Sequence, residues 1–156
     1  MKPIPDAVAP GTTTAYYGRG SLEGGRPGVY WVNTSKLDQR PLYELPALTA
    51  HEAVPGHHHQ IALAQEMDLP LQRRYGVSYA SFTEGWGLYA ESLGREMGLY
   101  DTPEKMMGHL SYEMWRACRL VVDPGIHAKG WTRDQAIQFM LDNTGLSRGN
   151  IEAEVN

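Results

Sequence analysis

One short stretch of the chain gathers the side chains best suited to hold a metal. His51 to Gln60 reads His-Glu-Ala-Val-Pro-Gly-His-His-His-Gln and contains four of the six histidines. Imidazole is the commonest side-chain metal ligand in proteins. A glutamate directly after the first histidine is the type of group that accepts a proton from water beside a bound zinc. The stretch is therefore an interrupted form of the His-Glu-x-x-His pattern, with Glu52 as candidate general base.

The spacing decides which histidines can share one metal. On a straight helix, residues four apart lie about 40° apart and roughly 6 Å along the axis, but the residue four after His51 is Pro55. His57 would face elsewhere, about 240° around, and His58 would lie about 10 Å further along. Because a Pro-Gly pair favours a kink, we predict one that brings His57 under His51. His58 then supports a ligand histidine, faces substrate or the surface, or serves as an alternative ligand. The alternative is a helix end followed by a polar, histidine-rich surface.

A mononuclear zinc also needs a third protein ligand and a position for water. The segment 79–91 supplies Glu84 and, seven residues on, Glu91, in a stretch whose large apolar residues recur at helical spacing. We predict a buried helix, in which a carboxylate is costly unless it is paired or binds metal. Glu84 is the predicted ligand. Glu91 is either the alternative ligand or a carboxylate that orients a ligand histidine.

The front of the chain is predicted to be irregular, because residues 1–27 are rich in proline and glycine. The segment 28–34 is rich in β-forming residues and bounded by turn residues, so it predicts a short strand or hairpin. We expect this strand to lie at an edge and to pair with an extended substrate. Tyr30 and Asn33 are then its substrate contacts. A hairpin that only covers the core is the alternative.

Helices should follow the strand, so the predicted fold is mainly α, a zincin-like helical domain with a short β strand near its N-terminal part. The first helix spans about 41–67 and the second about 79–97. The third begins at Thr102, the N-cap before a proline, and ends near Asp123. The fourth begins at Thr132 with a capping box and ends near Gly145. The third helix is expected to face the core through one apolar stripe: Met106, Leu110, Met114, Ala117 and Val121.

A Pro-Gly sequence after the third helix predicts a loop that carries polar side chains. Hydrolysis needs a donor that stabilises the oxyanion, and His127 is the candidate, with tyrosines 16, 17 and 30 as alternatives. Arg119 either binds a substrate carboxylate or pairs with Asp123. Asp123 is also a candidate to orient a metal ligand or to serve as an alternative ligand. A structural contact is the alternative for each of them.

Composition limits the classes of function. The 156 residues suit a single domain, and 42% hydrophobic with 21% charged residues is ordinary for a globular chain. A net charge of −4 without a basic run argues against binding of nucleic acid. No apolar run suggests a membrane span, and no signal peptide is recognised, so we expect a soluble protein, either cytoplasmic or exported. Cys118 has no second cysteine to pair with and is expected to be buried and inert.

Three motifs, in order, make a resemblance specific: His-Glu-Ala-Val-Pro-Gly-His-His, Thr-Glu-Gly-Trp-Gly-Leu-Tyr-Ala-Glu, and the segment from Arg119 to Trp131. Together they resemble a large bacterial family whose members carry a conserved domain of unknown function and are similar to the gluzincin metallopeptidases. The resemblance covers nearly the whole chain. It implies a zinc hydrolase with His51, His57 and Glu84 as ligands and Glu52 as base.

The chain departs from this family in two respects. His59 stands where an apolar residue is expected. Family members are usually several hundred residues long, and the chain resembles only their C-terminal catalytic part. The resemblance therefore implies a partial catalytic domain, completed by a missing N-terminal helical domain or by a second copy in a homo-oligomer.

The predicted reaction is hydrolysis of a peptide substrate with Zn²⁺ as cofactor. Glu52 accepts the proton of the attacking water and passes it to the leaving amine. Two alternatives remain open: a zinc hydrolase of a non-peptide amide or ester, and a metal-binding fragment without catalytic activity.

Overall fold

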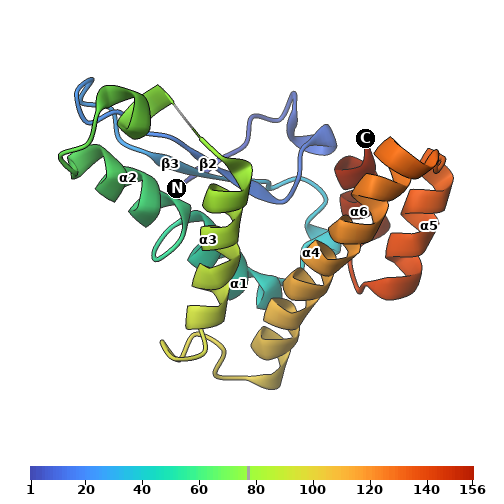
Figure 1. Ribbon diagram of the computed structural model, residues 1–156. Helices are drawn as coiled ribbons and strands as arrows, with labels where there is room; N and C mark the ends of the chain where they lie inside the picture. The colour runs from blue at the N-terminus through green and yellow to red at the C-terminus, as the bar shows by residue number, and fades with distance from the viewer. Residues whose placement is uncertain (77) are drawn as a thin grey trace.

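A small sheet at the front of the chain precedes a set of helices (Figure 1). The structure, a computed structural model, describes residues 1–76 and 78–156. Helices make up most of it, which confirms the predicted mainly α fold. The α-helices are α1 (Leu45–Glu52), α2 (His57–Glu66), α3 (Ala80–Leu93), α4 (Pro103–Lys129), α5 (Arg133–Asn143) and α6 (Arg148–Val155). Short 3-10 helices lie at Ala9–Gly11, Leu37–Gln39 and Leu42–Glu44, and a π-helical turn lies at Gln72–Gly76.

The sheet has three short strands in the order β1-β3-β2. β1 (Lys2–Pro3) runs parallel to β3 (Val29–Val32), and β2 (Ala15–Gly18) runs antiparallel to it. The strand predicted in 28–34 is thus present as β3. Its predicted place at an edge is wrong, because β3 has β2 along one side and β1 on the other, where β1 pairs only with Trp31 and Val32. The segment 1–27 is not wholly irregular either, since it supplies both flanking strands.

The predicted first helix is divided into α1 and α2 by a break at residues 53–56. Ala53 leaves helical geometry with φ −104° and ψ −110°, and the Val54–Pro55 peptide bond is cis. Gly56 lies against the end of α1, where a Cβ would be 1.8 Å from the His51 carbonyl oxygen. No larger residue fits there without a backbone shift. The break lies where the sequence predicts a kink, and α2 begins at His57.

Helix α3 packs through its small residues. Gly87, Ala90 and Glu91 are buried, whereas Phe82 is 68% exposed and Tyr89 is 53% exposed. The helix predicted to be buried is therefore buried only in part, because Phe82 and Tyr89 are exposed whereas Trp86 and Leu93 are half-buried. Small side chains allow α3 to approach α1 closely.

Helix α4 is longer than predicted. It begins at the expected Thr102 cap, passes through Pro124, and ends at Lys129, where Gly130 adopts a left-handed conformation (φ 71°). Proline removes one hydrogen bond to the carbonyl four residues earlier, but that residue, Leu120, is 80% exposed, so water can satisfy the carbonyl. The segment predicted as a Pro-Gly loop is thus the last turns of a helix.

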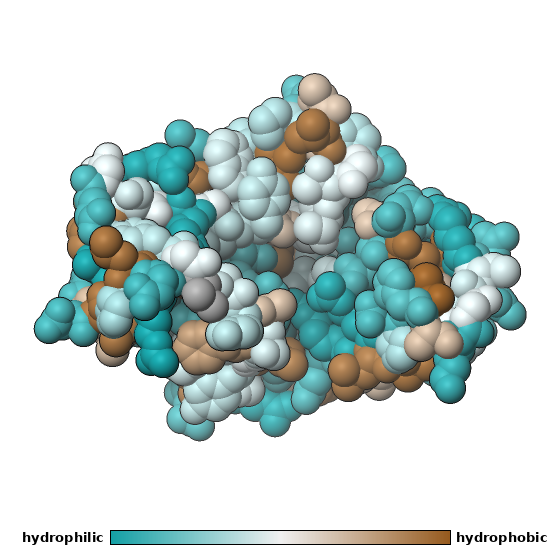
Figure 2. All heavy atoms as spheres, turned by 45° about the horizontal axis from the view of Figure 1, so that its top comes forward, coloured by the Kyte–Doolittle hydropathy of each residue, from teal (hydrophilic) through white to brown (hydrophobic). Residues whose placement is uncertain are grey.

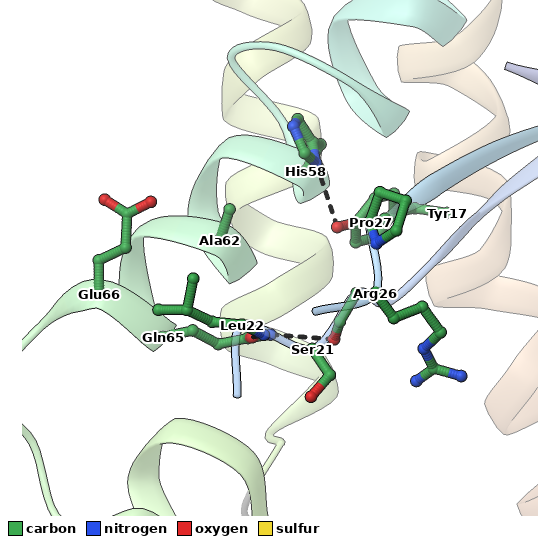
Figure 3. Close-up of a pocket in the computed structure, with 11 residues that line it drawn as sticks. Tyr17, Ser21, Leu22, Arg26, Pro27, His58, Ala62, Gln65 and Glu66 are labelled. Carbon is green, nitrogen blue, oxygen red and sulfur yellow. Dashed lines mark hydrogen bonds between the residues drawn. The ribbon is translucent and has the colours of Figure 1, made fainter. Parts of the chain in front are cut away.

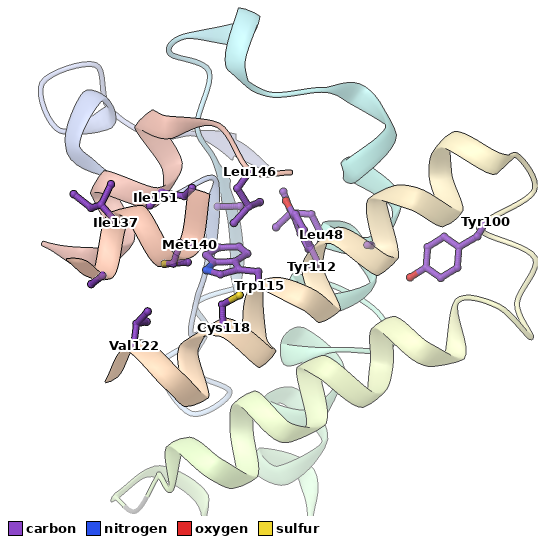
Figure 4. Close-up of a cluster of buried hydrophobic side chains, with 13 residues drawn as sticks. Leu48, Tyr100, Tyr112, Trp115, Cys118, Val122, Ile137, Met140, Leu146 and Ile151 are labelled. Carbon is purple, nitrogen blue, oxygen red and sulfur yellow. The ribbon is translucent and has the colours of Figure 1, made fainter. Parts of the chain in front are cut away.

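The main hydrophobic core lies between α4, α5 and α6 (Figure 4). The large apolar side chains that α4 buries are Tyr112, Trp115, Cys118 and Val122. The predicted stripe is wrong, because its members Leu110, Met114 and Val121 are exposed. Cys118 is buried as predicted. Helix α5 begins with the predicted Thr132–Gln135 capping box, and α6 was not among the predicted helices. None of the described helices is long and apolar enough to span a bilayer.

Candidate metal centre

Two histidines meet at the break between α1 and α2. His51, in the last turn of α1, and His57, the first residue of α2, are both buried, and their ring centroids lie 4.5 Å apart. The break thus brings together the pair predicted from the spacing. His58 faces β2 instead, where its Nδ1 lies 3.1 Å from the Tyr17 hydroxyl.

Glu84 from α3 completes a cluster with the two histidines. Its Oε2 lies 3.4 Å from Nε2 of His51, and its Oε1 lies 3.5 Å from Nε2 of His57. One ligating atom from each residue lies within 4.8 Å of the others. In a tetrahedral zinc site with bonds of about 2.0–2.2 Å, neighbouring ligand atoms lie about 3.3–3.6 Å apart. The donor types and their spacing therefore fit zinc, and they come from the three predicted ligand residues.

Glu91, the alternative ligand, lies behind His51. Its Oε1 is 2.7 Å from Nδ1 of His51, and its side chain is fully buried. When Nδ1 donates its proton to this carboxylate, Nε2 keeps a lone pair that can bind metal. Glu91 thus has the geometry of a carboxylate that orients a ligand histidine.

Arg116 on α4 supports Glu91, and sequence reasoning missed it. Its Nη2 lies 3.2 Å from Oε1 of Glu91, and its guanidinium lies over the rings of Tyr112 and Trp115. The available signal was indirect: a carboxylate predicted to be buried on one helix requires a cation from another. Arg116 follows Tyr112 by one turn at the border of the buried face of α4.

The electrostatics of the cluster favour a positive charge on His51 in the absence of metal. Burial lowers the pKa of His51, but hydrogen bonds to Glu84 and Glu91 outweigh burial and raise it to about 9. Hydrogen bonds from His51 and His57 hold the pKa of Glu84 far below its usual value. Metal-free His51 is therefore an imidazolium between two carboxylates at neutral pH.

Zinc binding is expected to release roughly one to two protons per ion at about pH 7.5, because Nε2 of His51 must lose its proton to bind and a zinc-bound water, whose pKa falls to about 7, loses most of another. The release should fall toward about one as the pH rises above the His51 pKa of about 9, because only the proton of the water then remains to be lost. Calorimetric titration in buffers of different ionisation enthalpy measures the number of protons. The control variant His59→Gln, which replaces an exposed histidine, should release the same number of protons on zinc binding. A release of about one proton both at pH 7.5 and above pH 9 would show that His51 is not a ligand.

Glu52 is buried beside the cluster. Burial raises its pKa, and the neighbouring His51 and His57 oppose that rise. Its Oε2 has no hydrogen-bond partner in the described part of the chain. Successive helical residues point about 100° apart, so Glu52 lies next to the ligand His51 without sharing its direction. A buried carboxylate with a free oxygen at this place can accept a proton from a water at the cluster.

Two adjoining pockets lie between the sheet and the helices. The sheet-side pocket, about 420 Å³, is lined by Met1, Tyr17, Gly28, Tyr30, Thr49, Ala53 and His58. The hairpin pocket, about 150 Å³, lies between α2 and the β2–β3 connection (Figure 3). Both pockets share Tyr17, Gly28 and His58. Gln65 holds the hairpin against α2, because it accepts a hydrogen bond from the Leu22 amide and donates one to the Gly20 carbonyl.

Comparison with known proteins places the chain in a family. Residues 1–156 match the model of a family described as a bacterial protein of unknown function, DUF885. The chain belongs to this family. No match is found among curated proteins.

Two solved structures share the fold of this DUF885 chain. A "putative lipoprotein" from Colwellia psychrerythraea is 41% identical, with a TM-score of 0.91 over 99% of the chain. A "putative lipoprotein of unknown function" from Shewanella oneidensis is 23% identical, with a TM-score of 0.69 over 92% of the chain. The chain spans 27% and 29% of the lengths of these two proteins.

Three predicted site residues of the DUF885 chain lie on the outer part of α4 and do not join the cluster. His127 and Asp123 are each 74% exposed, and their nearest charged atoms lie 3.6 Å apart. His127 is eleven residues beyond Arg116, about 16 Å along the helix, so the structure does not bring it to the metal ligands. Arg119 pairs with Glu154 of α6 at 2.7 Å rather than with Asp123.

Asn33 has a structural role in place of the predicted substrate contact. It is 2% exposed, and its amide lies within 2.7 Å of the Ala9 carbonyl and 2.9 Å of the Thr12 carbonyl. Its side-chain oxygen accepts from the amide and hydroxyl of Ser35. Tyr30, by contrast, faces the sheet-side pocket, and its pKa is raised by burial and by the charge of Glu52.

In the DUF885 chain, the absence of a side chain at Gly87 leaves room for the His51 ring. A Cβ on Gly87 would lie 2.5 Å from Cε1 and 2.8 Å from Nε2 of His51, whereas Gly85 faces open space. Gly87→Ala should displace the imidazole and weaken zinc binding roughly ten-fold or more, the effect of disturbing a ligand's surroundings. Gly85→Ala on the same helix is the matched control and should leave the affinity unchanged. Zinc titration of both variants makes the test, and equal affinities would contradict it.

Proposed function

We propose that this chain is the catalytic part of a zinc-dependent hydrolase of peptide bonds. One observation carries the proposal: the metal-ligating atoms of His51, His57 and Glu84 converge from three helices beside the buried carboxylate of Glu52. The resemblance of the three motifs to the gluzincin metallopeptidases supports the same reaction.

The donor set favours zinc among the common metals. Two imidazoles and one carboxylate, with a position left for water, are typical of catalytic zinc sites. Magnesium and calcium prefer oxygen ligands only. His51, His57 and Glu84 would hold the ion, which supplies Lewis acidity and lowers the pKa of a bound water to about 7.

Side chains of this chain transfer the proton and orient the metal-binding ring. Glu52 accepts the proton of the attacking water and delivers it to the leaving amine. Glu91 and Arg116 fix the ring of His51, so that Nε2 faces the cluster. Burial keeps the Glu52 carboxylate next to the reacting atoms and away from competing solvent.

Tyr30 takes the role of oxyanion donor in this proposal, in place of His127. Its hydroxyl lies near enough to Glu52 to be affected by that carboxylate, and its pKa is raised above the ordinary value, so it remains a hydrogen-bond donor at neutral pH. His127 lies too far along α4 to reach the same atoms.

The proposal includes a partner that covers exposed apolar side chains. This partner is either a second copy of the chain or an additional helical domain. Figure 2 shows hydrophobic side chains exposed at several places on one face of the molecule. Phe82 and Tyr89 on α3, and Leu110, Met114 and Leu120 on α4, are exposed. Figure 1 shows α3 and α4 diverging from the turn that joins them. Burial of such side chains favours association.

Elemental analysis and a peptide library test the function directly. Protein purified without a histidine tag should contain about one zinc per chain, the stoichiometry of a mononuclear site. It should cleave peptides, lose that activity with a chelator, and regain it with added zinc. Failure to take up zinc on titration would contradict the proposal. Zinc with hydrolysis of esters or non-peptide amides alone would indicate the other hydrolase class, and zinc without any hydrolysis would indicate a binding module.

A further inference from the structure

The sheet-side pocket is assembled from three elements that converge next to Glu52. Tyr17 on β2 and Tyr30 on β3 are directly paired across the two strands, so their side chains leave the same face of the sheet. Thr49 in α1 and Ala53 directly after it lie one helical turn apart and line the opposite wall. His58, from the first turn of α2, closes a third side.

The pocket lies next to Glu52, the candidate base, rather than on the side of α1 that carries His51. Relative to His51, Glu52 points about 100° around the helix, and Thr49 and Ala53 lie about 60° and 100° further on. Glu52 is therefore between the ligand histidine and the pocket. The effect of the Glu52 charge on the Tyr30 pKa agrees with this placement.

The lining is mostly aromatic and aliphatic, and it also includes the imidazole of His58 and the exposed Met1. Two phenol rings and the methyl groups of Thr49 and Ala53 face the pocket, and no Asp, Glu, Lys or Arg side chain is among the described residues that line it. A volume of about 420 Å³ lies within the range of about 300–1,000 Å³ that is usual for ligand pockets. An unpaired charge would lose its hydration here without a partner, whereas an apolar group would gain contact.

A hydrogen bond between Tyr17 and His58 lies where this pocket adjoins the hairpin pocket. The two side chains line both pockets, and the Tyr17 hydroxyl lies 3.1 Å from His58 Nδ1, a contact that Figure 3 draws at the hairpin pocket. Gly28 makes room for this placement of Tyr17, because a Cβ there would lie 2.0 Å from its hydroxyl. The contact therefore holds two of the lining side chains in place.

We propose that the sheet-side pocket is a specificity subsite that binds an apolar, preferentially aromatic, side chain of the substrate residue next to the hydrolysed bond. This inference rests on the proposed peptide hydrolysis. Aromatic side chains bury about 150–250 Å² each, and they stack favourably on tyrosine. Thr49, Tyr17 and Tyr30 are the residues that select the side chain.

Methyl-labelled protein allows a binding test that does not depend on catalysis. The probes are N-acetyl-L-phenylalaninamide and N-acetylglycinamide, titrated into the zinc-loaded full chain with labelled alanine and threonine methyl groups. The phenylalanine probe should bind roughly ten-fold more tightly than the glycine probe. It should shift the methyl signals of Thr49 and Ala53 more than that of Ala62, which lines the hairpin pocket.

Thr49→Phe tests the same pocket by filling it. The variant should lose the phenylalanine preference, with at least roughly ten-fold weaker binding of that probe. Gln138→Phe, the same change on the exposed side of α5, is the control and should bind both probes as the wild type does. Equal binding of the two probes to wild type, or shifts confined to Ala62, would overturn the subsite. Absence of zinc or of peptide cleavage, with the pocket still selective, would instead overturn the proposed function.

Discussion

Glu52→Gln is expected to bind zinc normally and to lose peptide hydrolysis by about a thousand-fold, within the range that general acid–base catalysis contributes. The amide has the size of the carboxylate but cannot accept the proton of water. The ligand atoms come from other residues, so the metal site remains intact. Measurement of zinc content and of kcat on a peptide found in the library provides the test.

Stability can be separated from catalysis in this variant. Glu52 is buried, and burial raises its pKa, so the charged form disfavours the folded state before metal binds. Replacement by a neutral amide should therefore leave the melting temperature unchanged or higher. Glu113→Gln, on the exposed side of α4, controls for the loss of one carboxylate. Full activity in Glu52→Gln would remove Glu52 from the mechanism, and a lower zinc content would give it a role in binding.

The break in the metal helix could be predicted from the sequence because steric rules act locally. Pro55 and Gly56 interrupt a helix whatever surrounds them, and the two histidines on either side make sense only if the helix is broken. The details were not available from the sequence. Contact of Gly56 with the end of α1, and space for His51 over Gly87, depend on how two helices approach each other.

The buried faces of α3 and α4 could not be predicted correctly, because periodicity alone does not say which side of a helix meets a neighbour. Both helices carry large apolar side chains on more than one side. On α3 the side that packs on α1 is made of Gly87 and Ala90, which carry little hydrophobic signal, while Phe82 and Tyr89 are exposed. Close approach of α3, which brings Glu84 and Glu91 to His51, requires small residues at this contact.

The ends of α4 show the same limit. The N-terminal cap at Thr102 is a local signal and was predictable. Pro124-Gly125 is also typical of a helix end, yet the helix continues, because Leu120 is exposed to water and Trp131 packs directly against Gly125. Because of this error, His127 and Arg119 were predicted to belong to the site. The residue of α4 that contacts Glu91 at the site is instead Arg116, two turns before Asp123.

Glu84→Ala is expected to lose zinc. This result distinguishes Glu84, the proposed ligand, from Glu91, which lies behind His51. Zinc sites with four protein ligands bind with about 10–16 kcal/mol, roughly 3–4 kcal/mol per ligand, so removal of one should weaken binding by about a hundred- to a thousand-fold. Glu84 is 55% exposed, so the fold should survive the change. Competition with a chelating dye measures the affinity, and thermal denaturation with and without zinc shows whether bound metal still stabilises the protein.

Glu91→Gln gives the contrasting result. Its side chain can still accept a hydrogen bond from Nδ1 of His51, so zinc should remain bound with an affinity about ten-fold lower, the smaller effect of a group that only orients a ligand. The change also leaves Arg116 without its carboxylate partner, so the melting temperature of the metal-free protein should fall. The opposite ranking, with zinc retained in Glu84→Ala and lost in Glu91→Gln, would make Glu91 the third ligand. Equal retention in both variants would mean that two histidines alone hold the ion, and a catalytic site with three protein ligands would then be wrong.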